Sequence, residues 1–377
     1  MIRWRTARVD AVRAEWPGAV EYAVTVFETG GGGRGAAAAC RALGYVGLVG
    51  RAEPGDTVLL NVAALERGLG TGGLALVVAI PDRLPADPPP GPGHVVKARY
   101  TPLQAMVLGV DEQESPHHET LADADTIASM PVVTADLHSA LPAVLAGLRA
   151  GRPGVRVAYV MTDGGALPAA FSRTVTGLRE AGWLDACITV GQAFGGDLEA
   201  VTVHTGLLAA RLVVGADVAI VAQGPGNLGT GTRWGFSGTS AGEAVNAAHV
   251  LGGRAIASLR VSEADARPRH RGLSHHSVTA YGRVALAPAE VPVPDEASPL
   301  ARQVRRQAEQ LCAGSAGRLR LVDVPTTGLD EALSVSPVPL RTMGRDLGTD
   351  RMAFVAAAVA GRRAADVLGR ASNLCPD

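Results

Sequence analysis

The stretch "PVVTADLHSALPAVLAGLRAGRPGVRVAYVMTDGG", residues 131–165, decides the fold. It opens with an apolar run at 131–136 and closes with a second one at 155–161. Between them, residues 141–151 have helical composition and end in glycine, a common stop signal. Short apolar strands without polar alternation are expected where helices cover both faces of a sheet. The stretch therefore predicts a strand, a helix and a second, parallel strand.

The same rhythm continues along the chain. Apolar runs at 186–190, 217–223 and 255–261 predict three further strands, each separated from the next by a helical stretch. Alternation of this kind is typical of a doubly wound, mostly parallel α/β sheet.

The segments on either side have a different character. Residues 1–80 contain short β-rich runs separated by glycine clusters, which predicts a small β-barrel-like domain. Residues 81–93 form a proline-rich linker. We assign residues 94–297 to the α/β ligand-binding domain. We expect residues 298–377 to form a helical C-terminal extension that packs on it, with its Ala-rich helix as a candidate homo-oligomer contact.

Composition excludes several classes of protein. The chain of 377 residues has a formal net charge of −1 and is 47% hydrophobic, so no basic surface for nucleic acid or membrane is expected. No apolar run is long enough for a membrane helix, and the first residues lack a secretory apolar region. The four cysteines show no paired spacing. We therefore expect a cytoplasmic protein without nucleic-acid or membrane partners.

Polar side chains follow the predicted strands. Asp136 and His138 come after the first strand, Asp163 after the second, and Asp197 after the third at an expected helix start. Ligands of open parallel sheets bind at the carboxyl ends of the strands, so we expect these residues at one rim. Asp136 and His138 would share a face while the strand persists.

A glycine-rich loop, "QGPGNLGTGTRWGFSG", follows the fourth strand at residues 223–238. Gly224 and Gly226 would let the backbone approach a ligand closely, and Thr230 and Thr232 would add donors for phosphate or carboxylate. The alternative is a lid in which the glycines serve only turns.

The stretch "RHRGLSHHS", residues 269–277, follows the fifth strand. Arg269 and Arg271 would clamp an anion, and His270, His275 and His276 would supply acid–base chemistry or metal ligands. If consecutive strands are neighbours in the sheet, this loop and the glycine loop face one pocket. Whether a divalent metal is bound stays open.

Lys97 is the only lysine in the chain. We predict that it contributes to binding the anion, because an ammonium group and a guanidinium group are not equivalent. The alternative is an ordinary exposed strand lysine.

These patterns predict an anionic small-molecule ligand, either a phosphorylated metabolite or a nucleotide. An enzyme of this design would be a hydrolase or transferase in which His138 or a histidine of 270–276 transfers protons. Asp163 or Asp197 would orient a histidine or hold a metal. The alternative is a non-catalytic metabolite-binding or regulatory protein. Nucleic-acid binding by the first domain is disfavoured because aromatic residues are few and no basic stripe is present.

Several blocks together resemble a bacterial family, domain of unknown function 3866. They include "GHVVKARYTPLQ", "RVAYVMTDGGALP", "VAQGPGNLGTGTRWGFSG" and "RHRGLSHHS", and the resemblance covers most of residues 1–295. It implies no activity, cofactor or catalytic residue.

Overall fold

The computed structural model describes residues 2–27, 38–70 and 72–372. Backbone contacts divide the chain into two compact units. The first consists of Met1–Pro92 with Ala98–Ala105, and the second consists of Gly93–Lys97 with Met106–Asp377. Each unit has a hydrophobic core of its own.

The first unit is a closed barrel of five strands, which confirms the predicted β-barrel-like domain. Val9, Tyr22, Leu60 and similar side chains are buried in its interior, as the alternation of inward and outward residues requires. The short helices α1 (Val46–Val49) and α2 (Ala63–Glu66) lie in its loops. The strands, in barrel order, are β1 (Trp4–Trp16), β2 (Ala19–Val26), β3 (Ala38–Tyr45), β5 (Leu74–Ala79) and β4 (Thr57–Asn61), and β4 pairs with β1 to close the ring.

The second unit is built on a sheet of eight strands in which every pair is parallel. Its central strands are buried at every residue because helices cover both faces. In sheet order the strands are β11 (Leu198–Glu199), β10 (Ala186–Thr189), β9 (Val157–Thr162), β12 (Val218–Gln223), β8 (Pro131–Ala135), β13 (Arg254–Ala257), β16 (Ala289–Asp295) and β17 (Leu319–Pro325).

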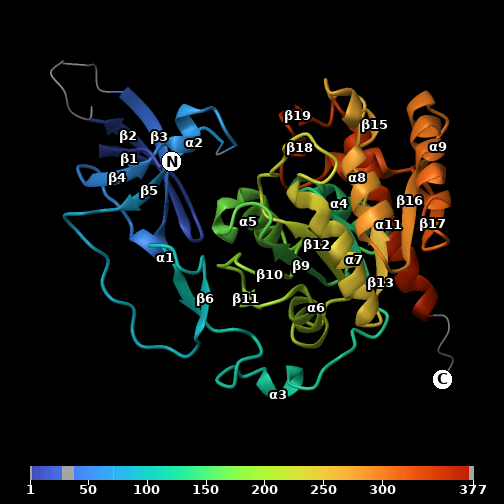
Figure 1. Ribbon diagram of the computed structural model, residues 1–377, viewed down its shortest axis with the longest axis horizontal. Helices are drawn as coiled ribbons and strands as arrows, with labels where there is room; N and C mark the ends of the chain where they lie inside the picture. Colours follow the sequence, from blue (N-terminus) through green and yellow to red (C-terminus); the bar gives the residue numbers. More distant parts are fainter. Residues whose placement is uncertain (1, 28–37, 71, 373–377) are drawn as a thin grey trace. The chain divides into compact units, whose positions relative to one another are not determined.

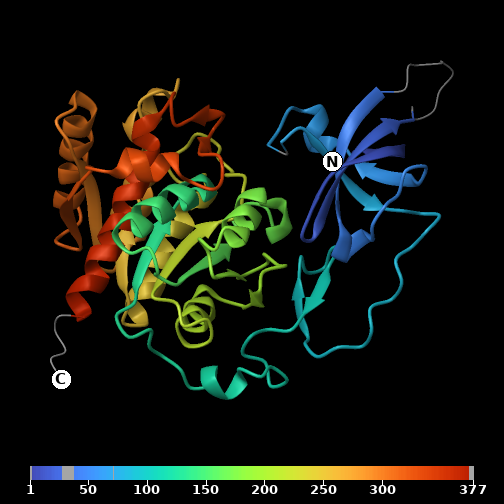
Figure 2. The ribbon, with the colours of Figure 1, turned by 180° about the vertical axis from the view of Figure 1, so that it is seen from behind.

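Helices lie on both faces of this sheet, which confirms the doubly wound architecture. Figure 1 shows α6 (Val203–Leu212) and α7 (Ser240–Val250) in front of the sheet. Figure 2, seen from behind, shows α4 (Leu141–Gly151) and α11 (Arg351–Ser372) in front of it. We refer to these two sides as the α7 face and the α4 face.

The strand order corrects one expectation. Strands β12 and β13 are consecutive in the chain, but β8 lies between them and pairs with both. The premise that these two strands are direct neighbours is therefore wrong. Any contact between the loops that follow them must pass over the end of β8.

Residues 298–372 contribute strand β17 to the large sheet and the short pair β18 (Arg341–Thr342) and β19 (Arg345–Asp346), as well as helices. Helix α9 (Pro299–Ala313) connects β16 to β17, and the short α10 (Leu329–Ser334) precedes α11. Most side chains of α11 from Met352 to Val367 are buried, many of them against α4. The oligomer contact through this helix stays a prediction. No helix of residues 2–27, 38–70 and 72–372 combines the length and apolarity needed to cross a bilayer.

Two glycines set the close approach of α4 and α11. A Cβ atom added to Gly147 would lie 1.9 Å from the carbonyl oxygen of Ala358, and one added to Gly361 would lie 1.9 Å from that of Val144. Both clashes involve backbone atoms, which cannot rotate away. We therefore expect the α4–α11 contact to depend on these two glycines.

We predict that Gly147→Ala lowers the free energy of unfolding by about 3 kcal/mol, because overpacking forces the two helices apart. Gly154→Ala is the matched control, since a Cβ there meets nothing within 4 Å. It should change the free energy by less than about 0.5 kcal/mol. Chemical denaturation measures both. If wild type and Gly147→Ala were equally stable, α4 and α11 would be able to move apart without loss of stability, which would contradict the prediction.

Candidate functional site

Four buried polar atoms of the described residues have no hydrogen-bond partner, and all four belong to residues at the carboxyl ends of parallel strands or in the segments that follow them. They are Asp136 Oδ2, Thr162 Oγ1, Gln223 Oε1 and His275 Nε2. Leaving such an atom unpaired costs about 1–3 kcal/mol, so native proteins keep few of them. Their concentration at one edge of the sheet marks this rim as the candidate site.

Asp136 lies at the centre of the rim. It follows the last residue of β8, and only 3% of its surface is exposed. Its Oδ2 atom lies 3.6 Å from Nη1 of Arg260 and 3.5 Å from Nδ1 of His276. Its backbone carbonyl accepts a hydrogen bond of 2.6 Å from Nε2 of Gln223, the last residue of β12. Asp136 therefore connects the residues that follow β8, β12 and β13.

An aromatic stack joins the glycine loop to residues 258–277, which follow β13 and are called the histidine loop below. The ring of Phe236 lies 3.8 Å from the ring of His276 and is tilted by only 4°. Both side chains are buried. The two loops thus contact each other although their strands are separated by β8, and a shared ligand pocket stays a prediction.

His270, His275 and His276, called the histidine trio below, form one cluster. Their ring centroids are 4.4–4.9 Å apart. Ser274 caps the short helix α8 (His275–Thr279), and its Oγ atom also lies 2.7 Å from Nδ1 of His270. Because His275 and His276 occupy the first turn of α8 and His270 lies in the loop before it, adjacent side chains still reach one place.

Burial and nearby positive charges keep the imidazoles of His270 and His275 neutral. Burial, followed by the charges of Arg260 and Arg267, lowers the pKa of His270 to about 3. Burial, followed by His276 and Arg269, lowers the pKa of His275 to about 4. At neutral pH these imidazoles hold no extra proton, so they can accept a proton or bind a metal ion but have none to donate as imidazolium.

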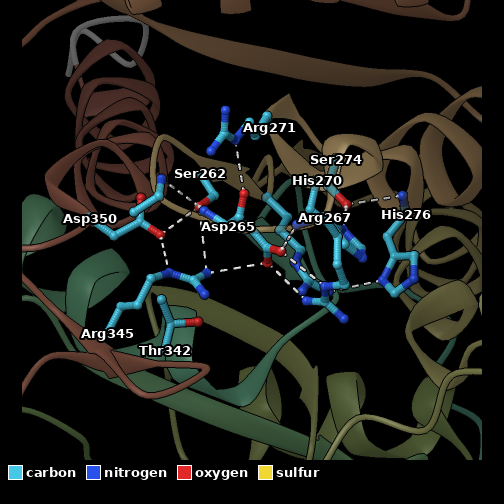
Figure 3. Close-up of polar contacts among 12 residues, drawn as sticks. Ser262, Asp265, Arg267, His270, Arg271, Ser274, His276, Thr342, Arg345 and Asp350 are labelled. Carbon is cyan, nitrogen blue, oxygen red and sulfur yellow. Dashed lines mark hydrogen bonds and ion pairs between the residues drawn. The ribbon is translucent and has the colours of Figure 1, made fainter.

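A polar network anchors the histidine loop to the start of α11 (Figure 3). Arg345 donates from Nε to Asp350 over 2.7 Å and lies 3.4 Å from the carboxylate of Asp265. Arg267 forms a two-pronged pair with Asp265, at 2.9 and 2.8 Å, and this pairing lowers the pKa of the Asp265 carboxyl. Ser262 donates to Asp350 over 2.6 Å. The loop is therefore held on its outer side.

A small cavity lies between this network and the rim. It has a volume of about 30 Å³, and its lining includes Asp136, Arg260, Ser262 and Arg345. That volume holds about two water molecules. A metabolite cannot enter it without movement of the surrounding side chains.

Arg269 and Arg271, the two arginines predicted to bind an anion, lie in different surroundings. Arg271 donates from Nε to the carbonyl of Asp265 over 3.0 Å, and Figure 3 shows its side chain directed away from the trio. Arg269 is exposed, and its Nη2 atom lies 3.7 Å from where a Cβ of Gly231 would stand. The structure therefore brings Arg269 to the glycine loop and leaves Arg271 outside.

The glycine loop is internally braced. A Cβ on Gly224 would lie 2.5 Å from the carbonyl oxygen of Ala166, so this glycine lets the loops after β9 and β12 touch. Thr230 Oγ1 and Thr232 Oγ1 lie 3.0 Å apart, and Thr232 Oγ1 accepts from the Gly235 amide. Gly226 has φ of +92° with open space around it. Of the predicted donors, the two threonines already have partners within the loop.

His138 does not join the trio. Strand β8 ends at Ala135, so the alternation that would put His138 beside Asp136 is lost. Its Nδ1 lies 3.0 Å from the Tyr159 hydroxyl and its Nε2 2.7 Å from Ser172 Oγ. Val160 faces Gly206 of α6, so the neighbouring Tyr159 points to the α4 face. The trio lies on the α7 face, because α8 continues into η5 (Ala280–Val284), which packs on α7.

The two remaining acidic candidates have partners elsewhere. Asp197 precedes β11 and not a helix, and its carboxylate accepts from the amide of Cys187, near the start of β10, and from Arg179. Asp163 is exposed and accepts from the amide of Gln192. Neither carboxylate is in contact with the trio in this arrangement.

Lys97 has a buried structural position. It is fully buried in β6 (Val95–Lys97), so the alternative of an exposed lysine is wrong. Its Nζ donates to the carbonyls of Ala193 and Ala200 at 3.0 and 2.9 Å and lies 3.5 Å from Glu199. Since an ammonium group has three donors, none is left for a ligand.

Sequence reasoning missed three residues of the rim. Arg260 stood inside a run assigned to strand, whereas β13 ends at Ala257. Phe236 and Gln223 were quoted only as part of the glycine loop. A charged residue at the carboxyl end of an apolar strand is the signal that could have indicated Arg260.

Stability should depend on pH through His138. Burial lowers its pKa to about 4 in the folded state, against about 6.5 in the unfolded chain. The unfolded chain therefore binds the extra proton first, and stability is lost as pH falls from about 6.5 towards 4. The loss from this residue alone is about 3 kcal/mol. We predict that the stability difference between wild type and His138→Gln shrinks over this range.

Denaturation at several pH values measures that difference, with His249→Gln on the exposed surface of α7 as the control. A difference between wild type and His138→Gln that stays constant from pH 7 to pH 4.5 would contradict the assignment.

We predict that Lys97→Met lowers the free energy of unfolding by about 3–5 kcal/mol, because Glu199 is left buried without its cation. The double variant Lys97→Met/Glu199→Gln removes both charges and should recover part of the loss. Thermal and chemical unfolding provide the comparison. If Lys97→Met were as stable as wild type, the buried position of Lys97 would be contradicted.

The comparisons with known proteins agree with the earlier resemblance. No functionally curated protein matches the sequence. The profile of a family described as proteins of unknown function, DUF3866, matches residues 41–361. This match starts later than the resemblance seen in the sequence and extends through β16, β17 and the first half of α11. Because it covers most of the chain, the protein belongs to the DUF3866 family.

Proposed function

We propose that the rim binds the phosphate group of a small metabolite or nucleotide between Arg269 and the glycine loop. The observation that carries the proposal is the position of Arg269. Its exposed guanidinium lies against Gly231, and it forms no hydrogen bond or ion pair with the described residues. A planar guanidinium can pair with two oxygens of one phosphate or carboxylate.

The surrounding charge supports an anion. Arg260 and Arg267 approach the same histidines as Arg269, and all three lower the pKa of His275. The nearby carboxylates Asp265 and Asp350 are paired with Arg267 and Arg345, and Asp136 faces Arg260. Arg269 has no carboxylate beside it in this group. The rim therefore has excess positive charge, which favours an anionic ligand.

The enzymatic form of the proposal is a hydrolase or transferase acting on that phosphate. Neutral imidazoles of the trio would lie beside the bound anion, where they could accept a proton from water or from an acceptor hydroxyl. Binding without turnover would instead identify a metabolite-binding protein with the same site. A cytoplasmic location belongs to this proposal, since the described cysteines Cys40, Cys187 and Cys312 are free thiols.

We predict that Arg269→Ala weakens binding of the phosphorylated ligand by about tenfold or more, the loss expected for one charge-assisted pair. Arg271→Ala is the matched control, since it removes a neighbouring arginine that points elsewhere. It should change the affinity by less than about twofold, and the wild-type affinity should fall with added salt.

A thermal-shift screen of nucleotides, sugar phosphates and orthophosphate identifies the ligand, since binding at a hundred times the dissociation constant adds about 2.7 kcal/mol. Calorimetry then compares the variants, and assays on phosphoesters test turnover. Equal affinities of the two arginine variants, or no stabilisation by any anion, would refute the proposal.

A further inference from the structure

The histidine trio has the composition and spacing of a metal-ligand set. His270, His275 and His276 each offer one ring nitrogen, and these three atoms lie within 4.8 Å of one another. His270 and His276 are 2% and 5% exposed. No other group of three His, Cys, Asp or Glu residues within the described ranges meets this criterion.

We propose that His270, His275 and His276 bind a transition-metal ion of the zinc class. Three histidines that leave a fourth position open are typical of catalytic zinc sites. Bonds of about 2.1 Å in tetrahedral geometry require nitrogens about 3.4 Å apart, so the rings must close by roughly an ångström. Imidazole ligands suit Zn²⁺, Co²⁺, Ni²⁺, Cu²⁺ and Fe²⁺.

The hydrogen bonds around the trio leave the required nitrogens available. Ser274 Oγ engages Nδ1 of His270, which frees Nε2 of that ring. Nε2 of His275 is buried without any hydrogen-bond partner. A metal ion would supply the partner that this atom lacks.

Metal binding by His276 would also give a partner to Asp136 Oδ2, a second buried atom without a hydrogen bond. Nδ1 of His276 lies 2.9 Å from Nη1 of Arg260 and accepts a hydrogen bond from it. Coordination through Nε2 places the proton on Nδ1, where it can be donated to Asp136 Oδ2, now 3.5 Å away and unpaired. Arg260 then turns to Asp136, from which it is 3.6 Å away. The result is a carboxylate–histidine–metal arrangement, the usual support for a metal-binding histidine.

The open position follows from the charges. Nη1 of Arg260 lies 2.9 Å from Nδ1 of His276, so this guanidinium opposes an uncompensated divalent cation. An anion in the fourth position, either hydroxide or the phosphate of the proposed function, offsets this charge. The metal site itself does not depend on that phosphate, and it is tested without one.

The test uses full-length protein stripped of metal with a chelator and titrated with Co²⁺ and Zn²⁺ in buffer free of phosphate. Calorimetry and the visible absorption of bound cobalt report binding. We expect one equivalent of ion with a cobalt spectrum of four-coordinate type. His275→Ala should weaken binding by about 100-fold or more, whereas His249→Ala, an exposed control, should leave it unchanged.

Asp136→Asn is the second variant, because it keeps all three ligands and alters only the support of His276. It should weaken binding by about 10- to 100-fold. Circular dichroism confirms that each variant is folded. The inference is overturned if wild type binds neither ion stoichiometrically, or if His275→Ala binds as tightly as wild type. Phosphate binding in the presence of chelator is scored separately, so the two proposals can fail independently.

Discussion

One buried carboxylate, Asp136, connects the parts of this rim. Its backbone carbonyl is fixed by Gln223 at the end of β12, while its side chain faces Arg260 and His276 from the segment after β13. A carboxylate in such a place is costly unless cations or hydrogen-bond donors surround it. The neighbouring arginine and histidine offset that cost, and their positions in turn depend on Asp136.

The fold explains why these groups meet. Strand β8 lies between β12 and β13, so the loops on either side reach each other over its carboxyl end, where Phe236 stacks on His276. The outer side of the histidine loop is fastened to the segment just before α11 through Asp265, Arg345 and Asp350. The site is thus built from the ends of the central strands, and the segment before the C-terminal helix holds its outer side.

Local patterns in the sequence were sufficient to predict the strands and helices of residues 131–165, because periodicity and glycine stops act over short distances. The clustering of Arg269 and the trio was also visible in the sequence. The order of the strands in the sheet could not be predicted in this way, because it depends on which strand edges pair with each other. Lys97 is satisfied by carbonyls at Ala193 and Ala200, about a hundred residues away, and His138 turns to the α4 face because β8 stops one residue before Asp136. Such partners are set by tertiary packing and cannot be read from spacing.

The most direct test of the central claim is a crystal structure of the cobalt-loaded protein, with diffraction data collected at the cobalt absorption edge. The account predicts one anomalous peak about 2.0–2.3 Å from a nitrogen of each of His270, His275 and His276. It also predicts that Nδ1 of His276 has moved within hydrogen-bond distance of Asp136 Oδ2. A peak at other residues, or a trio without metal in which His276 stays bonded to Arg260 and Asp136 stays unpaired, would contradict it.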